Sequence, residues 1–153
     1  MQLKNSVSII TGGSSGLGEA TVRKFHSLGS KVCVFDLDNE RGKKLERELG
    51  ENCAYFSVDV CHEPNIKEAI NAVIKQFNKI NINVNCAGIA LAEKTLGKDG
   101  PHDLTRFKKI IDVNLIGTFN ILRLCAEQMA KNPTDNSQEK GIIINTASVA
   151  ALE

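Results

Sequence analysis

The sequence predicts an α/β fold, with a doubly wound parallel sheet of five strands joined by crossover helices. Two observations point to this class. Short runs rich in β-branched residues alternate with segments of helical period along the 153 residues, and a glycine-rich turn follows the first run. With 42% hydrophobic residues, a chain of this length has enough apolar side chains for one core. We therefore expect residues 1–153 to form one domain.

The first half of the chain contains three predicted strands and two predicted helices. Gly29 and Gly50 come directly after the helical segments, where a glycine commonly caps a C-terminus. In order, we expect a strand at 7–11, a helix at 16–28, a strand at 31–36, a charged surface helix at 39–49 and a strand at 53–59.

The second half contains two longer apolar helices. Pro64 suits the first turn of a helix, and the apolar residues that follow recur at helical spacing up to Phe77. Asp103 is a suitable N-cap for a long helix over 104–131. We expect strands at 82–86 and 141–146, with loops at 87–101 and 132–140.

The predicted helix over 104–131 has two apolar stripes, of which one can cover the sheet. The other needs a neighbouring helix or a second subunit, because a helix face in water would be polar. One stripe comprises Leu104, Phe107, Ile111, Leu115, Leu122 and Cys125, and the other comprises Ile110, Val113, Gly117, Ile121 and Leu124.

Composition and charge argue against several classes of function. Nineteen basic and eighteen acidic residues give a net charge of +1 without a dense basic run, so we expect no nucleic-acid partner. Charged and amide side chains interrupt the apolar stretch 110–125, so we expect no membrane span, and we expect no secretory leader before residue 7. The five cysteines lack Cys-x-x-Cys spacing, which favours reduced thiols and no metal site. These features predict a soluble intracellular protein.

Glycines at fixed spacing follow the first strand and open the first helix. Gly12 allows a sharp exit from the strand, Gly16 lets the backbone approach a pyrophosphate, and Gly18 permits close packing of helix on strand. The free amides at the helix start favour negative charge there. Glycine turns also occur for structural reasons alone, so this motif by itself leaves nucleotide binding open.

Asp36 ends the second predicted strand, eighteen residues beyond Gly18. A strand–helix–strand unit places at this point the carboxylate that accepts hydrogen bonds from an adenosine ribose. The same carboxylate repels a 2′-phosphate, and neither Gly13 nor Leu37 supplies a basic side chain to offset it. The sequence therefore predicts a Rossmann-like dinucleotide-binding domain over 1–153 that prefers NAD to NADP.

Short motifs follow three further strands: DV at 59–60, NCAG at 85–88 and NTAS at 145–148. Because the carboxyl ends of parallel strands line the ligand crevice of an open sheet, we expect all three motifs to face the cofactor. Together with the glycine turn, DVN at 112–114 and the run 143–151, they resemble the short-chain dehydrogenase/reductase family. The resemblance extends over the whole chain.

The resemblance implies NAD as cofactor and two groups of site residues. Cys86, where most members have a second asparagine, makes the chain more similar to members that act on 3-hydroxyacyl-CoA or hydroxysteroid substrates. In the family pattern, Asn114 holds a water beside a catalytic lysine and Ser148 orients the substrate carbonyl. A polar residue that relaxes a helix and an ordinary loop serine are the structural alternatives. The implied cofactor residues are Gly12, Ser15, Gly16, Leu17, Gly18, Asp36, Asp59, Val60, Cys86, Ala87 and Gly88.

The family's catalytic tyrosine, and the lysine four residues after it, have no counterpart in these 153 residues. Tyr55 is the one tyrosine, and it lies in a predicted strand. We expect the chain to be the N-terminal part of such an enzyme, as a fragment, an incomplete gene model or a truncated isoform, with the C-terminal part of the fold absent. The resemblance implies a mitochondrial NAD-dependent dehydrogenase that forms a homotetramer when complete. The alternative is a non-catalytic NAD-binding or interaction module.

Overall fold

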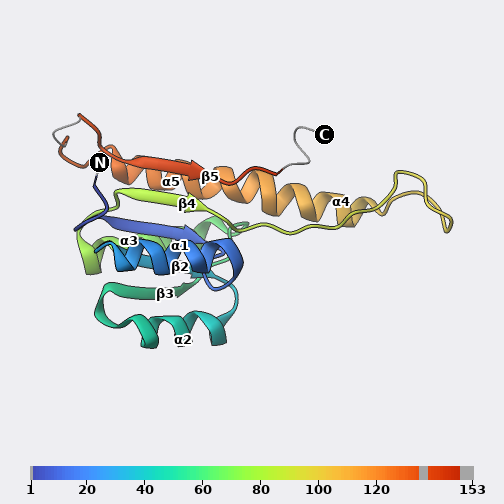
Figure 1. The fold of residues 1–153 in the computed structure, drawn as a ribbon. Helices are drawn as coiled ribbons and strands as arrows, with labels where there is room; N and C mark the ends of the chain where they lie inside the picture. Colours follow the sequence, from blue (N-terminus) through green and yellow to red (C-terminus); the bar gives the residue numbers. More distant parts are fainter. Residues whose placement is uncertain (1, 135–137, 149–153) are drawn as a thin grey trace.

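The computed structural model describes residues 2–134 and 138–148. Its strands form one parallel sheet in the order β3-β2-β1-β4-β5 (Figure 1). The predicted α/β class with a five-stranded parallel sheet is confirmed. The strands are β1 (Val7–Thr11), β2 (Lys31–Asp36), β3 (Cys53–Ser57), β4 (Ile82–Asn85) and β5 (Ile142–Asn145).

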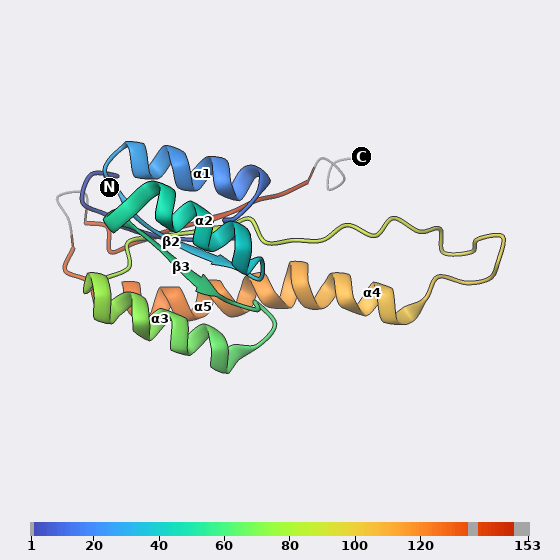
Figure 2. The same ribbon diagram turned by 90° about the horizontal axis from the view of Figure 1, so that it is seen from below.

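Helices connect the strands and cover both faces of the sheet (Figure 2). Two pack on one face and two on the other, so the sheet is the middle of three layers. The helical segments are α1 (Gly16–Ser27), α2 (Asn39–Leu49), the 3₁₀ turn η1 (Gly50–Asn52), α3 (Glu63–Phe77), α4 (Leu104–Ile111), the π-helical segment η2 (Asp112–Gly117) and α5 (Thr118–Met129).

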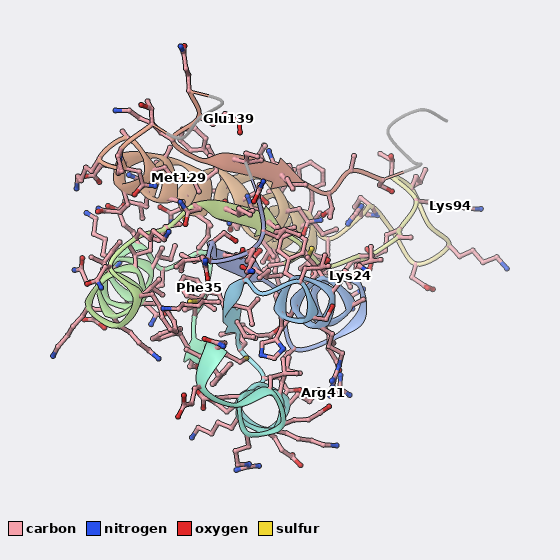
Figure 3. The ribbon with its side chains drawn as sticks, turned by 60° about the vertical axis from the view of Figure 1, so that its left-hand side comes forward. Lys24, Phe35, Arg41, Lys94, Met129 and Glu139 are labelled. Atoms are coloured by element: carbon pink, nitrogen blue, oxygen red, sulfur yellow. The ribbon has the colours of Figure 1, made fainter. Side chains whose placement is uncertain are left out.

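Successive residues of a strand point to opposite faces, and this alternation builds two cores. On β2, Val32 and Val34 pack in a buried cluster with Val22 of α1 and Leu45 of α2. Phe35 belongs to the other core, which α3 and α5 complete, and Figure 3 shows its side chain inside the molecule. Apolar cover on both faces explains why β2 has a continuous buried run rather than an alternating one.

The central strand β1 lies between β2 and β4, so the chain moves outward from β1 in both directions. At such a switch point, the connections after the two central strands diverge and leave a crevice at the carboxyl edge of the sheet. Thr11 of β1 pairs with Asn85 of β4. The glycine turn and the NCAG motif therefore leave the sheet side by side.

The helix predicted over 104–131 is present as one helical run from Leu104 to Met129, but it is not α-helical throughout. The π-helical segment η2 separates α4 from α5. A π-helix has more residues per turn than an α-helix, so side chains on its two sides face other directions than a single helical wheel predicts.

The second predicted stripe packs against the core from Val113 onward, whereas Leu115 of the first stripe is exposed. Ile121, Leu124 and Cys125 are buried against the sheet. Before η2, α4 extends past the carboxyl ends of the strands, as Figures 1 and 2 show, and has no layer to cover it. Exposed apolar side chains lie on all three helical segments: Leu104 and Phe107 on α4, Leu115 and Ile116 on η2, and Phe119 at the start of α5.

Candidate functional site

A cavity of about 540 Å³ opens at the carboxyl edge of the sheet, around the switch point between β1 and β4. Every residue that the sequence predicts at the cofactor site lines it. Those residues are Gly12, Ser15, Gly16, Leu17, Gly18, Asp36, Asp59, Val60, Cys86, Ala87 and Gly88.

The glycine turn forms one wall, and each predicted glycine occupies a different environment. Gly12 has a φ of +62°, and a Cβ atom there would lie 2.8 Å from the backbone nitrogen of Ala87. A Cβ atom on Gly18 would lie 2.0 Å from the carbonyl oxygen of Gly12, so helix and turn touch through backbone alone. Gly16, with a φ of +52°, has open space at its Cβ position. The turn therefore leaves free room beside the N-terminus of α1.

Thr11, just before the glycine turn, holds the cavity wall that follows β4 in place. The sequence prediction missed this role. Its Oγ1 accepts hydrogen bonds from the backbone amides of Cys86 (3.2 Å) and Ala87 (3.1 Å). The side chain is buried, so these two bonds hold the segment after β4 against the end of β1. A threonine that ends a strand before glycines was the available signal, but its partner lies 75 residues away.

Asp36 lies at the end of β2 with its carboxylate held in a fixed orientation. Its Oδ2 accepts a hydrogen bond from the amide of Ser14, and its Oδ1 accepts one from the amide of Asp38, both at 3.0 Å. Since each carboxylate oxygen has two lone pairs, both oxygens can still accept a hydrogen bond from a ligand. The cavity therefore contains an oriented acceptor where a ribose is expected.

A smaller hollow of about 270 Å³ adjoins the glycine turn between α1 and α2. It shares Ser15 and Gly16 with the main cavity, and Arg41 and Lys44 of α2 also line it. In the sequence, the neighbours Gly13 and Leu37 offer no positive charge near Asp36. The structure shows that α2 brings two basic side chains to this hollow, where the acidic side chains of Glu19 and Glu48 partly offset their charge.

Strand β3 ends at Ser57, two residues earlier than predicted, and the turn that follows lines the cavity. The amide of Val58 donates to the carbonyl oxygen of Asp36 at 3.1 Å, but the amide of Asp59 donates to the side chain of Asn65. The backbone therefore leaves the ladder at Val58 and turns Asp59 and Val60 toward the cavity.

Six lining residues were not predicted from the sequence. Lys109 and Val113 come from α4 and η2, one helical turn apart, and Lys109 brings a positive charge to the cavity. Their i, i+4 spacing places them on one helix face, but no local pattern indicates that this face turns toward the glycine turn. The others are Phe35, Leu37, Val58 and Ile89.

Asn114 of η2 pairs with the backbone of Ile89 in both directions. Its Nδ2 donates to the carbonyl oxygen of Ile89, and its Oδ1 accepts from the amide of Ile89, both at 2.8 Å. A Cβ atom on Gly88 would lie 3.4 Å from the same Oδ1. The side chain of Asn114 therefore anchors the segment after β4 on the helix and does not itself line the cavity.

The NTAS motif does not line the cavity, contrary to expectation. β5 is one strand farther from the switch point than β4, so residues 145–148 lie farther out along the same edge. Asn85 donates through Nδ2 to Oδ1 of Asn145 (2.8 Å), and Thr146 donates through Oγ1 to the carbonyl oxygen of Asn85 (2.8 Å). Ser148 is exposed, and residues 149–151 of the family motif lie outside the described residues.

The described residues contain neither a disulfide nor a cluster of metal-ligating side chains. All five cysteines are free, and burial raises the pKa of Cys86, so its thiol is protonated at neutral pH. Across residues 2–134 and 138–148, no three His, Cys, Asp or Glu side chains are grouped so that they could hold a metal ion. Nor does any helix in those ranges have the length and apolarity needed to cross a bilayer.

Sequence comparison places the chain among dehydrogenases. The family model for short chain dehydrogenases matches residues 6–153. The 3-hydroxyacyl-CoA dehydrogenase type-2 of Bos taurus is 44% identical over 153 residues, which are 99% of this chain and 59% of that protein. The Homo sapiens protein of the same name is 43% identical over the same shares.

Solved structures of similar fold agree with this placement. 3-Hydroxyacyl-CoA dehydrogenase type-2 from Mycobacterium avium superposes with a TM-score of 0.92 and 36% identity, over 100% of this chain and 61% of that one. A 3-ketoacyl-(acyl-carrier-protein) reductase from Brucella melitensis, solved with NADH, gives 0.88 and 29%, over 98% and 59%. The chain thus spans about three fifths of the length of these relatives. It belongs to the short-chain dehydrogenase family.

Proposed function

We propose that residues 1–153 form the dinucleotide-binding part of an NAD-dependent oxidoreductase. One observation carries the proposal: a single cavity at the switch point is lined by the glycine turn, Asp36, the Asp59–Val60 turn and the NCAG motif. The Brucella melitensis reductase, which has the same fold over this region, was solved with NADH. A site of this size and position suits an extended dinucleotide.

The lining residues divide the proposed site into three parts. The pyrophosphate lies at the N-terminus of α1, beside the open space at Gly16, where backbone amides and the helix dipole favour negative charge. The adenosine ribose donates to the carboxylate of Asp36, and the adenine contacts Asp59 and Val60. The segment 86–88 continues the site on the other side of β1.

For the complete enzyme, we propose a 3-hydroxyacyl-CoA or a hydroxysteroid as the substrate and a mitochondrial role in fatty acid metabolism. The support is the likeness to 3-hydroxyacyl-CoA dehydrogenases type-2. NAD supplies a hydride acceptor for oxidation of the substrate's secondary alcohol. Within this chain, Ser148 orients the substrate carbonyl, and Asn114 holds a water in the proton path. The complete protein is proposed to be a homotetramer.

The 153-residue chain alone is proposed to bind NAD without turnover, which keeps the non-catalytic module as the second candidate. Its one tyrosine, Tyr55, donates its hydroxyl to the carbonyl oxygen of Asp36 (2.9 Å), on the side of the sheet where α2 packs. Burial raises the pKa of Tyr55, which disfavours the phenolate. A tyrosine in that place does not serve as the acid and base of the reaction.

Two measurements test these proposals separately. Calorimetric titration of the chain with NAD should give saturable binding at one site. The absence of both binding heat with NAD and a change in NADH fluorescence on adding the chain would overturn the cofactor assignment. NADH formation from a 3-hydroxyacyl-CoA is then compared between this chain and a version joined to the Tyr-x-x-x-Lys helix of a relative. We expect at least about a hundredfold higher rate in the extended version, since positioned acid–base groups contribute that much. Equal rates would overturn the proposed dependence on that pair.

A further inference from the structure

The turn between β3 and α3, residues 58–61, is held in place from two different helices. From α3, Asn65 accepts the amide hydrogen of Asp59 at 2.8 Å through Oδ1 and donates to the carbonyl oxygen of Ser57 at 3.1 Å through Nδ2. Beyond the end of β3, these two bonds take the place of the hydrogen bonds that a neighbouring strand would provide. They fix the entry of the turn.

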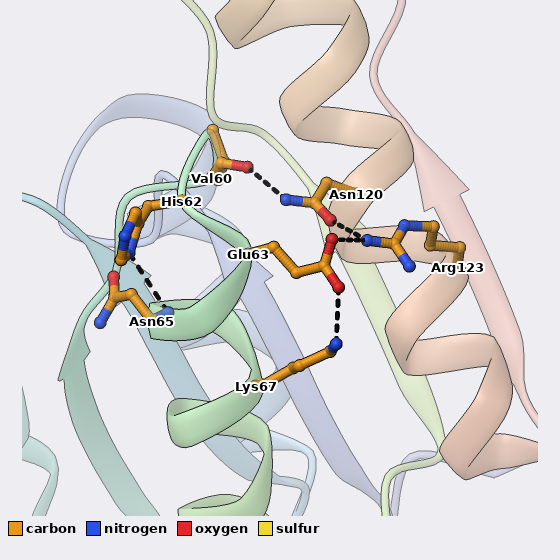
Figure 4. Close-up of polar contacts among 7 residues, drawn as sticks. All are labelled: Val60, His62, Glu63, Asn65, Lys67, Asn120 and Arg123. Atoms are coloured by element: carbon orange, nitrogen blue, oxygen red, sulfur yellow. Dashed lines mark hydrogen bonds and ion pairs between the residues drawn. The ribbon is translucent and has the colours of Figure 1, made fainter.

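The exit of the turn is held by Asn120 of α5. Its Nδ2 donates to the carbonyl oxygen of Val60 at 3.2 Å, and the residue is only 8% exposed (Figure 4). One turn earlier on the same helix face, a Cβ atom on Gly117 would lie 2.5 Å from Cγ2 of Val60. Helix and turn are therefore in direct contact at Val60.

Arg123 determines which way the Asn120 amide points. Its guanidinium has no acceptor and donates to Oδ1 of Asn120 at 2.7 Å, so the amide nitrogen must face Val60. Glu63 of α3 holds the same guanidinium, and Lys67 pairs with Glu63 at 2.6 Å (Figure 4). A chain of four side chains thus orients one buried donor toward the carbonyl of Val60.

We propose that Asn120 is a positioning residue for the adenine end of the dinucleotide. The inference rests on the proposed function, and it adds a residue that lies outside the cavity lining. With Asn65 and Asn120 bonded to consecutive residues, the Asp59–Val60 wall is already formed in the free protein. The ligand then does not have to order this turn when it binds, and its affinity is higher for that reason.

The test replaces Asn120 by Asp. In Asn120→Asp, the carboxylate still accepts from Arg123, but it faces the carbonyl of Val60 with an acceptor instead of a donor. We expect NAD and AMP, which both contain adenine, to bind about tenfold more weakly, as loss of one buried hydrogen bond implies. In the free variant, amide hydrogen exchange at residues 59–61 should be faster by a similar factor. A purely structural role in the core would not confine the change to this turn.

A matched control is Asn132→Asp, because Asn132 also bonds backbone carbonyls through its amide. Its Nδ2 donates to the carbonyl oxygens of Ile80 (2.7 Å) and Lys140 (2.8 Å) beyond the C-terminus of α5, at the opposite edge of the sheet. We expect its affinity for NAD and AMP to equal that of the wild type. If Asn120→Asp does not fold, Asn65→Ala, at a half-buried position, should show the same loss through the entry of the turn.

The outcomes separate the two proposals. Unchanged NAD and AMP affinities in Asn120→Asp and Asn65→Ala, beside normal binding by the wild type, would overturn the positioning role alone. A loss of equal size in Asn132→Asp would overturn it as well. Failure of the wild-type chain to bind NAD would instead overturn the proposed function, and this inference with it.

Discussion

The carboxylate of Asp36 accepts a hydrogen bond at 3.0 Å from the backbone amide of Ser14, and so joins the end of β2 to the glycine turn. A second bond from the amide of Asp38, also at 3.0 Å, prevents the carboxylate from rotating. The charge that is proposed to select the cofactor is therefore oriented before any ligand arrives. This arrangement reduces the ordering cost of binding.

Replacement of Asp36 by Asn should weaken the preference for NAD over NADP by about tenfold or more. Two unit charges near 4 Å interact by up to ~4 kcal/mol at an effective dielectric of about 20, and one third of that corresponds to about tenfold. The adjoining hollow is lined by Glu19 and Glu48 as well as by Arg41 and Lys44, so the expected change comes from the Asp36 carboxylate itself. Calorimetric titration of wild type and variant with both cofactors measures the ratio.

Asp38→Asn is the control for this change of charge. Asp38 lies two residues further on and caps α2 by accepting from the amide of Arg41 at 3.0 Å, a role that asparagine performs equally well. Its cofactor preference should remain that of the wild type. An unchanged NAD to NADP ratio in Asp36→Asn would show that another group selects the cofactor.

Replacement of Asn114 by Asp should destabilise the chain and loosen the segment after β4. The carboxylate can accept from the amide of Ile89, but it leaves the carbonyl oxygen of Ile89 facing a second acceptor. We expect the free energy of unfolding to fall by about 1 kcal/mol, the usual net contribution of a hydrogen bond, because Asn114 is exposed to solvent. Urea denaturation measures this change.

The matched control for Asn114 is Asn71→Asp, which introduces the same charge on an exposed face of α3. Its unfolding midpoint should stay close to that of the wild type. Equal midpoints for the two variants would contradict the anchoring role that the paired hydrogen bonds give to Asn114.

The glycine turn was predictable from sequence because everything that shapes it lies within a few residues. Gly12 and Gly16 have the positive φ angles that glycine tolerates. Gly18, in the first turn of α1, packs directly against the backbone of Gly12. The parallel five-stranded sheet followed from the alternation of strands and helices along the chain. Local patterns therefore identified every residue that the glycine turn contributes to the wall of the main cavity.

The remaining contacts could not be read in the same way, because they join residues far apart in the chain. Thr11 contacts Ala87, and Asn120 contacts Val60, across 76 and 60 positions respectively. Threonine and asparagine are common in many settings, so neither residue type nor spacing indicates such a partner. The π-helical segment was missed for another reason: its apolar residues fit an α-helical period as well.

Cys86 provides a test of where the ligand binds without any substitution. It lines the cavity, whereas Cys61 is exposed and does not. NAD at about ten times its Kd should slow alkylation of Cys86 about tenfold and leave that of Cys61 nearly unchanged. Mass spectrometry of the labelled peptides gives both rates.

The pH dependence of this labelling has a definite sign. Burial raises the pKa of Cys86, so its thiolate fraction at pH 8 is below that of a free cysteine. Its labelling rate should therefore continue to rise at pH values where an unperturbed thiol has levelled off. Cys125, with a pKa raised to about 12 by burial, should stay unlabelled while the chain is folded. Equal protection of Cys61 and Cys86 by NAD would contradict the assigned site.

Two apolar surfaces of this chain are open to self-association. On η2 and α5, Leu115 is 59% and Phe119 is 58% exposed, next to Ile116. On β5, the outer edge has no partner strand among the described residues, and Ile144 is 43% exposed. The helical surface exposes more apolar area, so it should dominate association.

We therefore expect the wild-type chain to scatter light as oligomers at tens of micromolar protein, and the two surfaces can be separated by substitution. Leu115→Asp with Phe119→Asp places two charges on the helical surface without touching the buried face of α5, and it should shift most of the protein to monomer. Ile144→Asp places one charge on β5 and should leave most of the oligomer intact. A monomeric wild type would contradict the expectation for both surfaces, and a monomer from Ile144→Asp alone would assign association to the sheet edge instead.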